Sequence, residues 1–129
     1  MKLLRYGPPG QERPGLLDGQ GRIRDLSAHL KDIDGDRLSP ASLRDLTGID
    51  PETLPVVEGN PRLGPPVANI GKFIAVGLNF SDHAAESNLP VPEEPVIFTK
   101  ATSCIVGPND NVTIRAARRK LTGRSNLAS

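Results

Sequence analysis

The stretch GKFIAVGLNFSDHAAESNLPVPEEPVIFTKATSCIVGPND, residues 71–110, decides the fold predicted for this chain. Two apolar runs, residues 72–80 and 95–101, have the length and the β-branched and aromatic content of strands. Between them, SDHAAES predicts a short helix with Ser81 as its N-cap, because a serine hydroxyl can accept a hydrogen bond from a free N–H of the first turn. The order of these segments predicts strand, helix, strand.

The same region continues into more strand-like sequence. A third strand is expected at CIVG, residues 104–107, followed by a turn at PNDN and a further strand-like run at VTI, residues 112–114. The 129 residues contain 13 glycines and 13 prolines but no tryptophan and one tyrosine, a composition typical of short strands joined by many turns. The expected fold class is therefore α+β, mainly β.

Upstream, residues 2–7 (KLLRYG) predict a strand and residues 14–27 predict two short extended runs around DGQG. Asp18 and Gly19 would supply the positive-φ chemistry of the hairpin turn. In LSPASLRDLTG, Ser39 is the expected N-cap of a short helix with Pro40 at its first position, and Gly48 would end it. Asp50, followed by proline, repeats the signal for a single helical turn.

Composition divides the chain into three parts. Residues 55–67 hold four prolines and two glycines with little periodicity and are interpreted as a linker, with a boundary near residue 66. We therefore expect a small β-rich N-terminal module with its linker at 1–66, the start of a second domain at 67–114, and a chemically different tail at 115–129.

The chemistry suggested by the sequence lies in SDHAAES. His83 and Glu86 are three residues apart, so on a helix their side chains share one face. A carboxylate bound to one imidazole nitrogen fixes the tautomer and makes the other nitrogen a better base for deprotonating water. The same spacing also occurs between solvated residues of an exposed helix. Asp82 is interpreted as a charge stabilised by the helix dipole.

The wider context of this pair resembles a known family. At the start of the catalytic domain of the fumarylacetoacetate hydrolase family, a strand ends in V-G-x-N-[YF], a D-H-x-x-E helix follows, and E-P-x-x-F-x-K-[PA]-[ST]-S leads to V-G-P. The matching positions are Gly77, Asn79, Phe80, Asp82, His83, Glu86, Glu94, Pro95, Phe98, Lys100, Ser103, Gly107 and Pro108. Residues 1–29 also resemble the N-terminal module of bacterial members, including ureidoglycolate lyases and diketo-sugar-acid hydrolases.

The resemblance implies a function for each landmark. His83 and Glu86 would be the catalytic pair that activates water, and Lys100 the catalytic cation that stabilises an enolate, although a lysine at a strand end is otherwise a snorkelling surface residue. Asn79, Phe80 and Ser103 would contact a small oxo-acid substrate. The family resemblance further implies a mixed β-roll catalytic domain, incomplete here, a Mg²⁺ or Mn²⁺ cofactor, and a homodimer. Phe80 and Ala101 replace a common tyrosine and proline.

The tail departs from the family pattern. All 15 acidic residues lie at or before Asp110, whereas the residues after 114 carry five basic residues and no acid. The family continues with P-R-G-x-x-K-x-D-W-E-V-E-L, whose glutamates bind metal. Back-translation of the tail with suitable wobble bases and one restored cytosine gives PRGTQKADWEVELGV. We therefore interpret residues 115–129 as an out-of-frame product and expect this chain to hold no metal and to be inactive.

A basic arm that contacts nucleic acid is the alternative interpretation of the tail. No aromatic residue is interleaved with its arginines for base stacking, so nucleic acid is not the expected partner. The single cysteine, Cys104, and the absence of a signal-peptide pattern or an apolar run of about 20 residues predict a cytoplasmic protein without a membrane partner.

Overall fold

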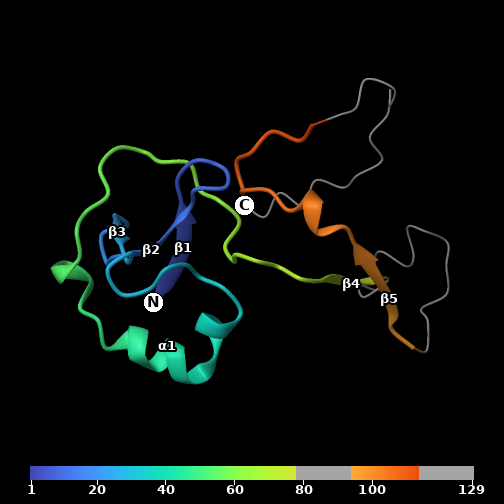
Figure 1. Ribbon diagram of the computed structural model, residues 1–129, viewed down its shortest axis with the longest axis horizontal. Coiled ribbons are helices and arrows are strands. Elements are labelled where there is room, and N and C mark those ends of the chain that lie inside the picture. The colour runs from blue at the N-terminus through green and yellow to red at the C-terminus, as the bar shows by residue number, and fades with distance from the viewer. Residues whose placement is uncertain (78–93, 114–129) are drawn as a thin grey trace.

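The computed structural model describes residues 1–77 and 94–113, which are mainly β with one α-helix (Figure 1). The first sheet is antiparallel and contains, in spatial order, β1 (Lys2–Tyr6), β2 (Arg13–Leu17) and β3 (Ile23–Asp25). The second pairs β4 (Phe73–Gly77) with β5 (Val96–Lys100), also antiparallel. The helices are α1 (Pro40–Thr47) and the 3-10 turns η1 (Asp36–Leu38), η2 (Pro51–Thr53) and η3 (Thr102–Cys104). The predicted mainly β class is confirmed.

The turn between β2 and β3 is built around Asp18. Its Oδ1 accepts hydrogen bonds from the N–H groups of Gln20 and Arg22, both at 2.9 Å. The predicted turn is confirmed, but the expectation of a positive φ at Gly19 is wrong. Gly21 takes that conformation, with φ +79°, because its N–H turns back to the Asp18 carbonyl and closes the loop there.

Helix α1 begins and ends where the sequence predicts. The Ser39 side chain accepts a hydrogen bond from the N–H of Ser42, Pro40 occupies the first position and Gly48 is the C-cap. The predicted turn after Asp50 is also confirmed, since its Oδ1 accepts from the N–H of Glu52 at 3.0 Å. Within the described residues, no helix is long and apolar enough to cross a membrane.

The hydrophobic core lies in the N-terminal module, between the first sheet and α1. Its buried members come from β2, the segment after β3, α1 and the end of η2: Leu16, Leu26, Leu30, Ile33, Leu46 and Leu54. Leu3 and Ile49 pack against this cluster from its margin. All of these residues precede residue 55, so the module has its own core.

Residues 55–67, predicted to be a linker, run along both edges of the first sheet, and we call this segment the strap. At one edge the N–H of Val57 donates to the Ile23 carbonyl at 2.8 Å. At the other edge the N–H of Gly64 donates to the Arg5 carbonyl at 2.8 Å. The strap therefore satisfies backbone groups on β3 and β1 that would otherwise be open. The division of the chain near residue 66 stays a prediction.

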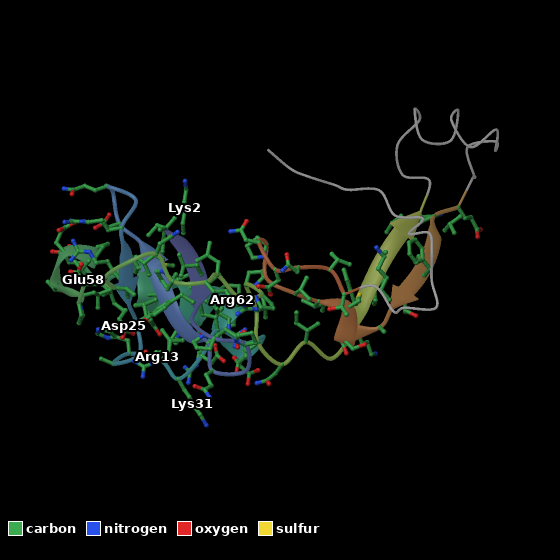
Figure 2. The ribbon with its side chains drawn as sticks, turned by 90° about the horizontal axis from the view of Figure 1, so that it is seen from above. Lys2, Arg13, Asp25, Lys31, Glu58 and Arg62 are labelled. Atoms are coloured by element: carbon green, nitrogen blue, oxygen red, sulfur yellow. The ribbon has the colours of Figure 1, made fainter. Side chains whose placement is uncertain are left out.

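Strands β4 and β5 form a separate hairpin that extends away from the module (Figures 1 and 2). They confirm the two predicted apolar strands within the described residues. The third strand expected at 104–107 is wrong. The N–H groups of Cys104 and Ile105 donate to the carbonyls of Ala101 and Thr102, both at 3.1 Å, so a local turn takes the hydrogen bonds that a sheet would require. Residues 112 and 113, expected to start a further strand, also lie outside any sheet.

Candidate functional site

The predicted site residues fall into two groups. His83, Glu86, Asn79 and Phe80 lie outside the described residues. Lys100 is the last residue of β5, and Ser103 lies in η3 shortly after it. The two described members are therefore close in sequence, at the point where the chain leaves the hairpin.

The ammonium group of Lys100 lies over two aromatic rings. Its Nζ is 5.6 Å from the ring centroid of Phe73 and 5.9 Å from that of Phe98. Phe73 is the direct cross-strand partner of Lys100, so the pairing of β4 with β5 sets this arrangement. None of the ion pairs formed among residues 1–77 and 94–113 involves Lys100. Ring faces attract a cation without neutralising its charge, which keeps it available to an anion.

Ser103 lines a hollow of about 510 Å³ between η3 and the N-terminal module. Arg5, Glu12 and Asp32 of the module face the same space, whereas Lys100 does not line it. The lining also includes Gly10, Pro65, Val67, Ala68, Asn69, Ile70, Thr102 and Ile105. The structure therefore brings Ser103 beside charged residues of the module, a juxtaposition that the sequence did not indicate.

Arg62 of the strap joins the module to the segment after η3, and we call this contact the clasp (Figure 2). Its guanidinium donates to both oxygens of Asp110, with 2.6 Å from Nε to Oδ1, and to Oε1 of Glu12 at 3.0 Å. The N–H of Gly107 donates to Oδ2 of Asp110 at 2.7 Å. The hydrogen bonds from Arg62 and Gly107 hold the pKa of Asp110 below its usual value despite desolvation.

Sequence reasoning missed the clasp. Arg62 and Asp110 are 48 residues apart, and Arg62 stands in a segment that its prolines and glycines marked as a linker. The one available signal was the charge of Arg62 itself, since a lone arginine in a proline-rich segment has no local acid to pair with.

Replacing Gly107 by alanine should loosen the clasp. A Cβ at this position would overlap the carbonyl oxygen of Leu63 and approach Oδ2 of Asp110 to 3.0 Å, so the backbone would have to move. We expect faster hydrogen exchange at residues 105–110 in Gly107→Ala, with the module itself unchanged. Gly71→Ala is the matched control, because nothing lies within 4 Å of its added Cβ. Equal exchange in the two variants would contradict this prediction.

Arg5 is held in a second group of charges on the wall of the same hollow. Its Nε and Nη2 donate to the two oxygens of Asp32 at 2.7 and 2.9 Å, and Glu12 lies 3.6 Å from Nη2. Burial alone would raise the pKa of Asp32, but the hydrogen bonds from Arg5 and from the N–H of Ile33 outweigh it and lower the pKa. Arg5 is thus saturated by carboxylates and not free to bind an anion.

Acid should destabilise the module through these carboxylates. Because the folded-state pKa of Asp32 lies below its unfolded value, its contribution to stability is present above about pH 4 and is lost as the pH falls through the folded pKa. Asp18 shifts in the same direction, since hydrogen bonds from Arg22, Arg24 and Gln20 outweigh its desolvation. We expect Tm, followed by circular dichroism, to fall below about pH 4 and to fall less steeply in Asp32→Asn. A parallel decline in both proteins would contradict the assignment to Asp32.

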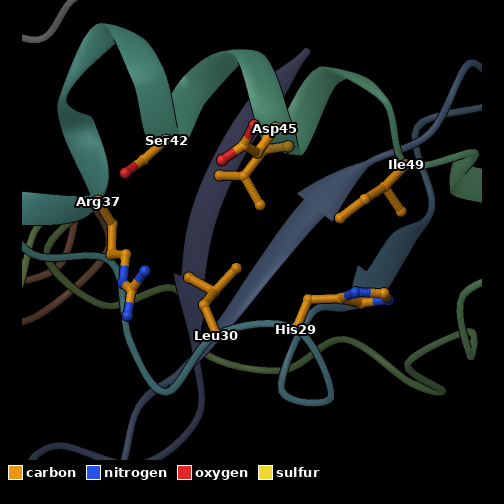
Figure 3. A pocket seen from close by; sticks show the side chains of 7 residues that line it. His29, Leu30, Arg37, Ser42, Asp45 and Ile49 are labelled. Carbon is orange, nitrogen blue, oxygen red and sulfur yellow. The ribbon is translucent and has the colours of Figure 1, made fainter.

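A second hollow, of about 280 Å³, lies between α1 and the turn that carries His29 and Leu30 (Figure 3). His29 and Arg37 flank it, and Asp45 reaches into it from the helix. Leu46 and Ile49 belong to its lining and also to the core or its margin. None of the predicted site residues lines this hollow, so it is not the candidate catalytic site.

Metal ligands are a separate matter. Among residues 1–77 and 94–113, no three His, Cys, Asp or Glu side chains are grouped so that they could hold a metal ion. Glu12, Asp32 and Asp110, the carboxylates nearest the hollow, are instead engaged by Arg5 and Arg62. The described residues therefore do not fit a metal centre.

Comparison with known proteins identifies the class. Residues 72–128, which include β4, Lys100 and Ser103, match the family described as fumarylacetoacetate (FAA) hydrolase, C-terminal. The chain belongs to the fumarylacetoacetate hydrolase family, as its motifs predicted. The match extends into the basic tail, and the out-of-frame origin of residues 115–129 stays a prediction.

Particular relatives come from bacteria. A protein from Burkholderia multivorans, named provisionally as a hydrolase, is 63% identical over 114 residues, which cover 88% of this chain and 40% of that protein. A relative from Burkholderia cenocepacia with a similar name gives the same values. The crystal structure of a protein from Mycobacterium smegmatis, provisionally named HpcE, superimposes with a TM-score of 0.63 at 29% identity, over 90% of this chain and 41% of that one. The chain thus spans about two fifths of the length of these relatives.

Proposed function

We propose that this chain is the part of a hydrolase or lyase that supplies the enolate-stabilising cation for cleavage of a carbon–carbon bond in a small 2-oxo or 1,3-dicarbonyl acid. The observation that supports it is the placement of Lys100. Its charge lies at the end of a strand in the matched family domain, over two rings and outside every ion pair of the described residues. A preorganised ammonium lowers the energy of an oxyanion that forms beside it.

In this proposal His83 and Glu86 activate the attacking water. Glu86 orients the imidazole of His83, which takes a proton from water as the water oxygen adds to a substrate carbonyl. The carbon–carbon bond then breaks, its electron pair moves into the enolate, and Lys100 stabilises the negative oxygen. Asn79, Phe80 and Ser103 are assigned to substrate contacts. The proposed site therefore combines residues of the helix after β4 with residues at the end of β5.

The cofactor and the assembly also belong to the proposal. Family members are typically metal-dependent, and Mg²⁺ or Mn²⁺ is the proposed ion for the whole enzyme. When bound, such an ion acts as a Lewis acid on the substrate oxygens. The described residues of this chain do not supply its ligands, and no step is assigned to them. A cytoplasmic homodimer completes the proposal.

A chimera tests the proposed reaction. Residues 1–114 of this chain would be joined to the part of the Burkholderia multivorans relative that follows the matched segment, and acylpyruvate cleavage would be measured with and without Mg²⁺ or Mn²⁺. We expect metal-dependent turnover by the chimera and none by the 129-residue chain. A folded chimera that cleaves no acylpyruvate would contradict the substrate class. Salt-sensitive binding of nucleic acid, lost when residues 115–129 are removed, would instead support the basic-arm alternative.

A further inference from the structure

The β4–β5 hairpin exposes apolar side chains on one complete face. Ile74, Val76 and Ile97 lie on that face and are 58%, 50% and 67% exposed. Val76 and Ile97 are direct cross-strand partners, and Ile74 lies two residues along β4, so the three side chains form one patch. An apolar patch of this kind marks a surface that another element covers.

The opposite face is also apolar. Val96 and Phe98 are both 43% exposed there, on the side that carries Lys100. Strands with apolar residues on both faces are typical of sheets covered on both sides. Within the described residues β4 pairs with β5 alone, so each strand also has one edge without a hydrogen-bonded neighbour. Two faces and two edges of the hairpin are therefore uncovered in this part of the chain.

The N-terminal module does not cover this surface. Its core residues all precede residue 55, and its contacts with the later segment are the clasp and the hollow beside η3 rather than the strands of the hairpin. A two-stranded hairpin by itself is marginally stable in water. A further polypeptide is needed to bury it.

We infer that the patch of Ile74, Val76 and Ile97 docks the remainder of the family's C-terminal domain, meaning a polypeptide equivalent to the part of the relatives that follows the matched segment. The matched 40% of the Burkholderia multivorans protein leaves 60% of its length to supply such cover. A second copy of this chain fits less well. A twofold contact would bury one face or one edge of each hairpin and leave the others in water, whereas additional strands and a packing layer cover all of them.

Co-expression tests this inference with the protein as it exists. The 129-residue chain would be tagged and produced with the C-terminal remainder of the Burkholderia multivorans relative, and the complex would be measured by co-purification and by titration. We expect a 1:1 complex. Val76→Asp and Ile97→Asp should each weaken it at least tenfold, because each places a carboxylate in the buried patch. Leu38→Asp, an exposed position in η1 of the module, is the matched control and should change affinity less than twofold.

A covalent version keeps the inference testable if the remainder does not fold when it is made separately. In the chimera described above, amides of residues 73–77 and 96–100 should exchange hydrogen at least tenfold more slowly than in the 129-residue chain. Unchanged exchange of these amides in a folded chimera would overturn the inference. So would a homodimer of the 129-residue chain that Ile97→Asp abolishes, or a complex indifferent to both aspartate variants. None of these readouts depends on catalysis, so they stand apart from the proposed reaction.

Discussion

Replacing Lys100 by methionine in the chimera should lower kcat for acylpyruvate cleavage by about 10²–10³-fold, the usual effect of removing one group that stabilises an oxyanion. Methionine keeps an unbranched apolar side chain over the rings of Phe73 and Phe98 and removes the charge. A steady-state assay measures the loss. Because the charge is needed mainly once the enolate forms, KM should change much less than kcat.

Lys72→Met is the matched control for this prediction. Lys72 is an exposed lysine directly before β4, so the substitution makes the same change of charge on the neighbouring strand. We expect its kcat to remain within about twofold of the parent chimera, since surface substitutions away from special features have small effects. Equal losses in the two variants would indicate a general electrostatic effect, and an active Lys100→Met would remove the role assigned to Lys100.

Replacing Leu26 by alanine should lower the free energy of unfolding of the module by about 2–5 kcal/mol, the range for a large-to-small change in a packed core. Leu26 is 0% exposed and belongs to the single buried cluster of the module. The lost methyl groups leave a cavity between the first sheet and α1 that neighbouring side chains fill only in part. Urea denaturation followed by circular dichroism measures the change.

Leu38→Ala provides the comparison, because Leu38 is an exposed leucine of the same module. Its effect should stay within about 0.5 kcal/mol. If the two leucines gave equal losses, the buried cluster would not be the source of the module's stability.

The elements that the sequence predicted correctly are those fixed by local chemistry. Ser39, Pro40 and Gly48 bound α1 because a cap, a preset φ and a helix stop act within one turn of the chain. Asp18 closes the β2–β3 turn through its own neighbours. The strand at 104–107 was predicted wrongly because an apolar run also fits a turn when its backbone hydrogen bonds are satisfied nearby.

The strap and the clasp show what local patterns cannot supply. Residues 55–67 carry the composition of a linker, yet their backbone hydrogen-bonds to β1 and β3 far away in sequence. The partner of Arg62 was equally hidden, since its pairing with Asp110 depends on how the module and the later segment pack. For the candidate site, the motif placed Lys100 after an apolar strand, but only the pairing of β4 with β5 brought Phe73 under its ammonium group.

By itself, the sequence determined the mainly β class, the ends of α1 and the residue types that mark the family, because turn chemistry, capping and motif spacing are carried by adjacent residues. Only the tertiary structure decided that Arg62 clasps Asp110, that Ser103 faces the charged residues of the module, and that the β4–β5 hairpin stands uncovered by the rest of the described chain. Those features depend on which distant segments meet, and contacts between distant segments are set by packing and by charges that find each other only after the chain has folded.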